Sequence, residues 1–156
     1  MAAGGTPGQV LVTASEDETS EAGRAMAATL RPGAVVMLIG PLGAGKTVFV
    51  RGLAAGLGLD AREVHSPSYT LVNEYGPSAS GRVLVHADLY RIDSPAEIEE
   101  LGLGDYLTRG CVIAVEWGEK LPGRLQAGAA RVSIEYLEDV AGEHTAEQRK
   151  IMFKLS

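Results

Sequence analysis

The sequence predicts an α/β fold in which helices cover a mainly parallel β-sheet. Two apolar segments, 34–39 and 111–115, have the continuous pattern of strands that are buried on both faces of a parallel sheet. Amphipathic segments with helix start and stop signals lie between and around them. Strands that alternate with helices are typical of a sheet covered by helices. Other segments, in which apolar and polar side chains alternate, indicate antiparallel strands at the edges of the sheet.

The N-terminal part of the chain predicts an edge strand and two helices. Residues 9–13 alternate apolar and polar side chains, as a short edge strand does. Ser15 and Glu18 form a capping box, which opens a helix that we expect to run to about Leu30. Beyond the apolar strand, side chains at helical spacing predict a second helix over 46–58.

The C-terminal part predicts a hairpin, a helix and two weaker strands. Segments 69–75 and 82–86 flank a turn rich in Gly, Pro and Ser, which indicates a hairpin. A Ser cap followed by Pro95 predicts a helix start. Two further strands are expected over 131–137 and 150–155.

Length and composition indicate one domain and exclude several classes of protein. The 156 residues suit a single domain over 1–156, and 46% hydrophobic with 22% charged residues is ordinary globular usage. One cysteine excludes an internal disulfide, and the apolar runs are too short for a membrane span of about 20 residues. Without a secretion signal, we expect a cytoplasmic protein. The net charge of -6 argues against unaided binding to nucleic acid.

A glycine-rich loop follows the first apolar strand. Residues 40–47, GPLGAGKT, match the phosphate-loop pattern G-x-x-x-x-G-K-[ST] at every specified position. Backbone amides of such a loop, with the first turn of the next helix, surround phosphate groups. Lys46 supplies a cation for the β- and γ-phosphates, and the Thr47 hydroxyl is a Mg²⁺ ligand. The residues expected to bind the nucleotide are Gly40, Gly43, Ala44, Gly45, Lys46, Thr47 and Val48.

The position of this loop narrows the fold class. A strand before it and an amphipathic helix after it predict a P-loop NTPase-like three-layer sandwich, with a mainly parallel sheet and antiparallel edge strands. The dinucleotide pattern G-x-G-x-x-G fits badly, because Val48 stands at its third glycine. Hydride-transfer chemistry therefore lacks its main sequence support.

Two carboxylates follow predicted strands, at the sheet edge where ligands bind in open parallel sheets. Glu116 comes directly after 111–115, and Asp88 closes the segment that precedes it. We expect Thr47 and Glu116 to hold Mg²⁺, directly or through water, and Asp88 to orient or deprotonate the attacking water. The sequence also allows the roles of Asp88 and Glu116 to be exchanged. Lys46, Asp88 and Glu116 are the candidate catalytic residues.

Residues near these carboxylates have two interpretations each. His86 is expected to be structural, since periodicity pairs it with Asp88 only loosely. Trp117 packs in the core or shields the site, and Arg91 is solvated or contacts phosphate. The hydroxyls of 66–70 sense the γ-phosphate or its metal, or belong to an ordinary Ser-Pro turn.

ATP is the favoured nucleotide by elimination. The chain has no [NT]-K-x-D element for guanine, and D-L-Y-R at 88–91 lacks the glycine of a GTPase D-x-x-G. No obvious arginine-rich lid is present, which weakens the case for a small-metabolite kinase. The kinase and a nucleotide-gated binding module stay open as alternatives to an ATPase.

Four motifs in one order resemble a known family. They are the phosphate loop, SPSYTLV at 66–72, HADLYR at 86–91 and VEW at 115–117. This series resembles TsaE, the bacterial ATPase subunit of tRNA threonylcarbamoyladenosine synthesis, from Val36 to about Lys120.

The resemblance implies a small ATPase that uses ATP and Mg²⁺ and works with a threonylcarbamoyl-transferase subunit and its paralogue. ATP turnover would support or reset modification of adenosine 37 in tRNA, which the partner proteins hold. In this comparison Lys46 meets the phosphates, Thr47 and Glu116 the Mg²⁺, and Asp88 the catalytic centre. Family members commonly have a hydroxyl residue where Val48 stands, which puts an α-phosphate contact in doubt, and Thr where Ser68 stands.

Overall fold

The computed structural model describes residues 8–138 and 144–155. It contains seven strands, five α-helices and two 3₁₀ helices within those residues. In chain order they are β1 (Val10–Thr13), α1 (Glu16–Ala27), β2 (Val35–Ile39), α2 (Lys46–Gly56), η1 (Ala61–Glu63), β3 (Val72–Tyr75), β4 (Leu84–Asp88), α3 (Pro95–Glu100), α4 (Leu103–Thr108), β5 (Val112–Glu116), η2 (Gly118–Lys120), α5 (Gly123–Gln126), β6 (Ala130–Glu138) and β7 (His144–Leu155).

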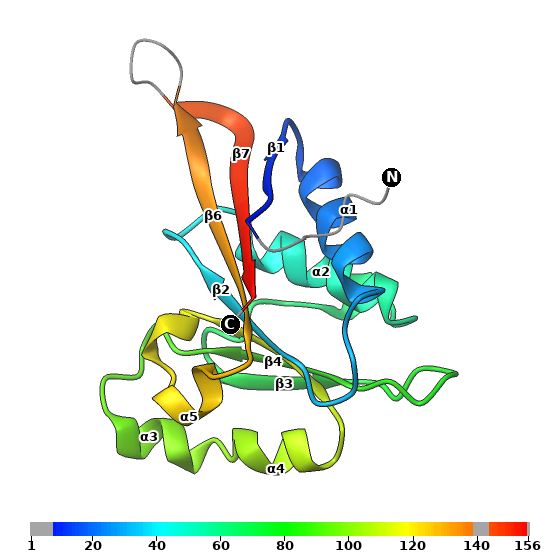
Figure 1. Cartoon of the computed structure of the whole chain (residues 1–156), viewed down its shortest axis with the longest axis vertical. Coiled ribbons are helices and arrows are strands. Elements are labelled where there is room, and N and C mark those ends of the chain that lie inside the picture. The colour runs from blue at the N-terminus through cyan, green and yellow to red at the C-terminus, as the bar shows by residue number, and fades with distance from the viewer. Residues whose placement is uncertain (1–7, 139–143, 156) are drawn as a thin grey trace.

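All seven strands form one mixed sheet in the order β1-β7-β6-β2-β5-β4-β3 (Figure 1). The central strands β6, β2, β5 and β4 run parallel, whereas β1 and β7 at one side and β3 at the other are antiparallel to their neighbours. The expected α/β fold with a mainly parallel sheet and antiparallel edges is confirmed. Asp88 pairs with Glu116 in the register of β4 and β5, so both acids lie at the same edge of the sheet.

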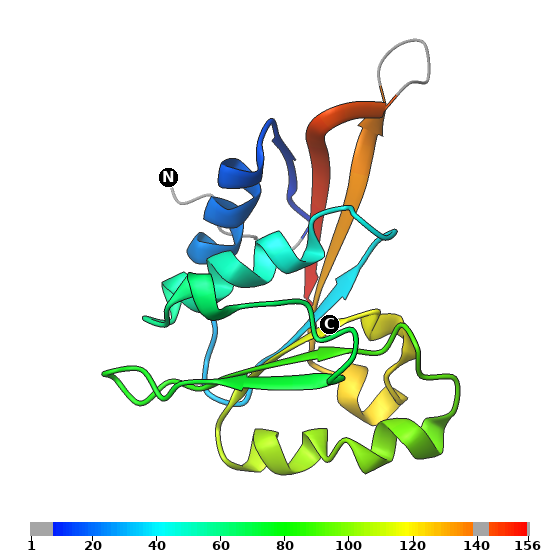
Figure 2. The same ribbon diagram turned by 180° about the vertical axis from the view of Figure 1, so that it is seen from behind.

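Helices pack against both faces of the sheet. Residues of α1 and α2 share a buried apolar cluster with alternate side chains of β2, β4, β5 and β6. The helices α3, α4 and α5 lie on the opposite side of the sheet (Figure 2). Their apolar residues form a second buried cluster with the sheet side chains that point to that side. No helix in this part of the chain is long and apolar enough to cross a membrane.

Close packing of α1 on α2 depends on glycine. A Cβ atom on Gly52 would lie 1.8 Å from the backbone oxygen of Ser20, and one on Gly23 would lie 2.2 Å from that of Phe49. The two backbones therefore approach more closely than any side chain would permit. This contact brings the start of α1 beside the loop that precedes α2, and it explains part of the high glycine content.

Several predicted boundaries are wrong for local reasons. Helix α1 ends at Ala27 rather than near Leu30, because the amide of Thr29 bonds back three residues to Met26 in a turn. Strand β3 begins only at Val72, since Leu71 has a left-handed φ of 69° that no strand accommodates. Helix α4 was not predicted.

Candidate functional site

The glycine-rich loop connects β2 to α2 at the carboxyl edge of the sheet. Its last residue before the helix, Gly45, has φ 107°, a left-handed conformation that side chains disfavour. Helix α2 then begins at Lys46, so its first amides and its positive dipole end face the loop. The predicted strand, loop and helix arrangement is confirmed.

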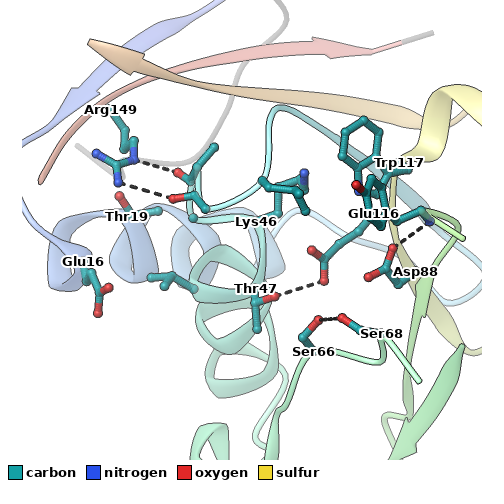
Figure 3. A pocket seen from close by; sticks show the side chains of 16 residues that line it. Glu16, Thr19, Lys46, Thr47, Ser66, Ser68, Asp88, Glu116, Trp117 and Arg149 are labelled. Atoms are coloured by element: carbon teal, nitrogen blue, oxygen red, sulfur yellow. Dashed lines mark hydrogen bonds between the residues drawn. The ribbon is translucent and has the colours of Figure 1, made fainter. Parts of the chain in front are cut away.

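A cleft of about 580 Å³ opens above this loop. Figure 3 shows Glu16 and Arg149 toward one end, Asp88 and Glu116 toward the other, and Lys46 between them. The lining residues come from α1, the loop, α2, segment 66–68, the ends of β4 and β5, and β7. They are Glu16, Thr19, Leu42, Gly43, Ala44, Gly45, Lys46, Thr47, Val48, Ser66, Ser68, Asp88, Tyr90, Glu116, Trp117 and Arg149. Gly40 does not line the cleft but accepts a hydrogen bond from Lys46 below it.

Lys46 is only 4% exposed and lies beneath the cleft. Its ammonium donates to the backbone oxygens of Gly40 and Pro41, the latter at 3.2 Å, and lies 4.2 Å from the centre of the Trp117 ring. Burial lowers the pKa of Lys46, while the carboxylates of Glu116 and Asp88 oppose that shift. The ammonium therefore lies largely out of water and close to two acids.

Glu116 is the last residue of β5, and its contacts with Thr47 and His86 both involve one carboxylate oxygen, Oε2. The Thr47 hydroxyl donates to Oε2 of Glu116 at 3.1 Å, and Nε2 of His86 lies 2.5 Å from the same atom. His86 is fully buried, and its Nδ1 has no hydrogen-bond partner among the described residues. Sequence reasoning missed this contact of His86, which fixes the orientation of the Glu116 carboxylate.

Asp88 ends β4 and is 6% exposed. Its Oδ1 accepts the backbone N–H of Tyr90 at 2.9 Å. Burial raises the pKa of Asp88; the Tyr90 amide opposes that shift, and the negative charge of Glu116 adds to it. The carboxylate therefore takes up a proton more readily than an exposed aspartate does.

Lys120 anchors the segment after Asp88 through hydrogen bonds to its backbone. The ammonium of Lys120 donates to three backbone oxygens, those of Leu89, Tyr90 and Ile92, each at 3.0 Å. The ring of Tyr90 lies 5.1 Å from that of Trp117. Trp117 was expected either to pack in the core or to shield the site. It does both in part, because it packs against the second apolar cluster and its ring lies over the ammonium of Lys46.

Segment 66–70 reaches the cleft through two hydroxyls. Ser66 and Ser68 both line it, with their Oγ atoms 2.8 Å apart. Tyr69 points away and is 83% exposed, and the guanidinium of Arg91 stacks 4.5 Å from its ring. Arg91 is not among the lining residues, whereas the two serines are.

Two lining elements carried no motif that predicted a place in the site. Glu16 and Thr19 belong to the first turns of α1, and Arg149 belongs to β7, in the C-terminal part for which only weak strands were predicted. Arg149 donates to the backbone oxygen of Ala44 at 2.8 Å. A main-chain acceptor leaves no signature in the sequence, so no pattern could have identified this contact.

The oxygen donors of the site suit a hard divalent cation. The Thr47 hydroxyl and the Glu116 carboxylate are of the kind that Mg²⁺ prefers. No cluster of three His, Cys, Asp or Glu residues that could hold a metal is present in the described chain. A cation here would therefore complete its coordination with water and with oxygens of a bound ligand, which is how Mg²⁺ binds beside phosphates.

The fold and the cleft define an α/β protein with a seven-stranded mixed sheet, largely parallel in its core, and a glycine-rich loop at its carboxyl edge. The family model for threonylcarbamoyl adenosine biosynthesis protein TsaE matches residues 13–151. The chain therefore belongs to the TsaE family.

Individual relatives agree with this assignment. The tRNA threonylcarbamoyladenosine biosynthesis protein TsaE of Haemophilus influenzae is 42% identical over 105 residues, which cover 67% of this chain and 65% of that relative. The protein of the same description from Bacillus subtilis is 37% identical over 133 residues, or 85% of this chain and 81% of the relative. The crystal structure of Bacillus subtilis YdiB superposes with a TM-score of 0.67 at 28% identity and covers 97% of this chain and 90% of that one.

Proposed function

We propose that the protein is a P-loop ATPase with a three-layer NTPase fold, which binds and hydrolyses ATP with Mg²⁺ in the cleft. In this proposal ATP turnover supports threonylcarbamoyl modification of adenosine 37 in tRNA. The transferase subunit and its paralogue would act as partners that hold the tRNA. The observation that carries the proposal is the meeting of Lys46, Thr47, Asp88 and Glu116 in one cleft above a phosphate loop, in a member of the TsaE family.

The loop and Lys46 would bind the triphosphate. Amides of Gly43, Ala44, Gly45 and the first turn of α2, including that of Val48, would surround the β- and α-phosphates. Lys46 would leave the loop carbonyls that it contacts in this structure and bind between the β- and γ-phosphates. Its desolvation strengthens such a charge interaction, because water no longer screens it.

Thr47 and Glu116 would hold Mg²⁺, directly or through water. When bound, the metal would neutralise negative charge that develops on the phosphates. Glu116 is already oriented toward Thr47 by the contacts of its Oε2 with Thr47 and His86. The carboxylate thus needs little rearrangement to reach a cation beside the Thr47 hydroxyl.

Asp88 would accept the proton of the attacking water or orient that water. Because one oxygen of Glu116 is engaged by Thr47 and His86, the structure favours this distribution of roles over the exchanged one. The raised pKa of Asp88 brings its basicity closer to neutral pH, which favours proton acceptance.

Exposed apolar side chains around the cleft support a role for partners. Leu42 and Tyr90 line the cleft and are 60% and 46% exposed, and Tyr69 beside Ser68 is 83% exposed. Water in an open cleft screens the charges that stabilise a phosphoryl transition state. A partner that covers these side chains would exclude it, so we expect slow turnover alone and faster turnover in the complex.

The direct test is phosphate release from ATP, measured with and without the purified transferase subunit and its paralogue. We expect Mg²⁺-dependent release that these partners stimulate. Transfer of γ-phosphate to any acceptor other than water would instead identify a kinase. Equal partner affinity with ATP and with ADP would argue against a nucleotide-gated binding module.

A further inference from the structure

The C-terminal hairpin contacts the outer side of the phosphate loop. Tyr136 of β6 and Arg149 of β7 are paired directly across the two strands. The Tyr136 hydroxyl donates to the backbone oxygen of Leu42 at 3.0 Å. Arg149 donates through Nε to that of Ala44 at 2.8 Å and through Nη2 to that of Gly43 at 3.4 Å. Three successive loop carbonyls therefore accept hydrogen bonds from one strand pair.

These bonds fix the direction of the loop peptides. In a trans peptide the N–H of the next residue points opposite to the carbonyl. Holding the carbonyls of Leu42 and Ala44 toward the hairpin therefore turns the amides of Gly43 and Gly45 to the other side of the loop. Amides in that orientation are the groups that a phosphate-binding loop presents.

The loop also fits against β6 without space to spare. A Cβ atom on Gly40 would lie 2.2 Å from the backbone oxygen of Ile134, and one on Gly43 would lie 2.7 Å from the Tyr136 hydroxyl. The hairpin therefore supports the loop at Gly40 and at residues 42–44. In addition, the Arg149 guanidinium stacks 4.5 Å from the Tyr136 ring, which holds the two donors together.

We propose that Tyr136 and Arg149 form an outer clamp, a pair of positioning residues that holds loop 40–47 in its phosphate-binding conformation before the nucleotide arrives. This inference rests on the proposed nucleotide binding and deepens it. A loop held in advance loses less conformational freedom when the ligand binds, so the clamp raises affinity without contacting the ligand.

A direct contact of Arg149 with the nucleotide is the competing explanation, since Arg149 lines the cleft. Tyr136 separates the two, because it is not among the lining residues and its hydroxyl bonds to the loop. Tyr136→Phe removes that donor and keeps the ring. Arg149→Lys keeps the charge but loses the fork that spans Gly43 and Ala44.

The test measures the dissociation constants of ADP and ATP by calorimetry for wild type, Tyr136→Phe, Arg149→Lys and the double variant. Lys150→Gln, which removes a charge from the neighbouring position of β7, is the control. We expect each clamp variant to bind both nucleotides about tenfold more weakly, as the loss of an ordered hydrogen bond implies. Because the two residues hold one loop, the double variant should lose less than the product of the single losses.

Hydrogen exchange on the free proteins gives a second readout. The backbone amides of loop 40–47, apart from Pro41, which has none, should exchange faster in both clamp variants. The melting temperatures of these variants should stay well above the assay temperature. Unchanged ADP and ATP affinity in Tyr136→Phe, or a loss only in Arg149→Lys, would overturn the clamp while leaving nucleotide binding intact. A wild-type protein that binds neither nucleotide would overturn the proposed function, and the clamp with it.

Discussion

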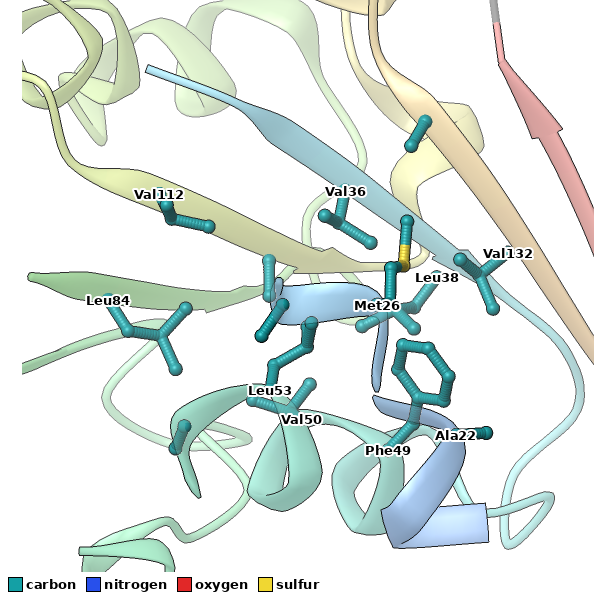
Figure 4. Packing of buried hydrophobic residues seen from close by; sticks show 14 of the residues in the cluster. Ala22, Met26, Val36, Leu38, Phe49, Val50, Leu53, Leu84, Val112 and Val132 are labelled. Carbon is teal, nitrogen blue, oxygen red and sulfur yellow. The ribbon is translucent and has the colours of Figure 1, made fainter. Parts of the chain in front are cut away.

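One face of the sheet has two ends of opposite character. Near the start of β4 and β5, Leu84 and Val112 are buried and pack with Leu53 of α2 in the first apolar cluster (Figure 4). Farther along the same face, the same two strands present His86, Asp88 and Glu116, all buried and all polar. The two-residue period of the strands places both sets on one side.

The apolar end of this face stabilises the fold, whereas the polar end carries the groups proposed for function. Apolar side chains at the first end gain free energy when they leave water, so this end stabilises the fold. Ionisable groups at the second end lose hydration when they are buried, which opposes folding unless partners compensate. We attribute the presence of these groups at the cleft to the proposed phosphate chemistry. Substitutions should therefore lower the free energy of unfolding at the apolar end and raise it at the polar end.

The largest expected effect is on turnover at the polar end. Lys46→Ala removes the cation proposed for the β- and γ-phosphates and should lower kcat for ATP by about 10²- to 10³-fold, as removal of one preorganised charge partner does. Steady-state phosphate release measures it, with the exposed Lys154→Ala as control. Turnover of Lys46→Ala equal to wild type would remove Lys46 from the mechanism.

The next effect is on stability at the apolar end. Leu53→Ala leaves a cavity at a fully buried position and should lower the free energy of unfolding by about 3 kcal/mol. Leu42→Ala, the same substitution at a 60% exposed position beside the cleft, should change it by less than about 0.5 kcal/mol. Urea denaturation of both variants makes the comparison, and equal losses would contradict the assignment of Leu53 to the core.

A smaller effect of opposite sign is expected at Asp88. Asp88→Asn keeps an acceptor for the Tyr90 amide and removes a buried charge, so it should raise the free energy of unfolding at pH 7 by about 1 kcal/mol. Since folding raises the pKa of Asp88 above its ordinary 3.8, the folded state binds this proton more tightly. Wild-type stability from this group thus falls as pH rises from 3.8 through the raised pKa. The gain of the variant should accordingly disappear toward pH 3.8, and a gain independent of pH would contradict this cause.

The smallest effect concerns Lys46 at alkaline pH. Because burial lowers the pKa of Lys46 below 10.5, the unfolded state binds this proton more tightly. Its contribution to stability therefore increases as pH rises from the lowered pKa to 10.5. Lys46→Met should be more stable than wild type at pH 7 by about 1 kcal/mol or less, and the difference should shrink toward pH 10.5. A difference that grows with pH would have the wrong sign.

The parts of the fold that the sequence predicted are those where one physical requirement fixes the residue types. A strand buried on both faces must be apolar throughout, so 34–39 and 111–115 were found within one or two residues of β2 and β5. The phosphate-loop pattern requires glycine, lysine and a hydroxyl at fixed spacing, so the place of the glycine-rich loop before α2 followed from the sequence.

Other parts depend on contacts between distant segments. The meeting of His86 with Glu116 follows from the register of β4 against β5, which pairs Asp88 with Glu116, and no local pattern encodes that register. Arg149 acts on main-chain oxygens 105 and 106 residues away. Acceptors that every residue possesses leave no trace in composition or spacing.

A crystal structure with Mg²⁺ and a non-hydrolysable ATP analogue tests the central claim most directly. We expect the phosphates within about 3 Å of amides between Gly43 and Val48, with the cation beside Thr47 and Glu116. A nucleotide bound elsewhere, or a loop that stays empty at saturating analogue, would contradict the account.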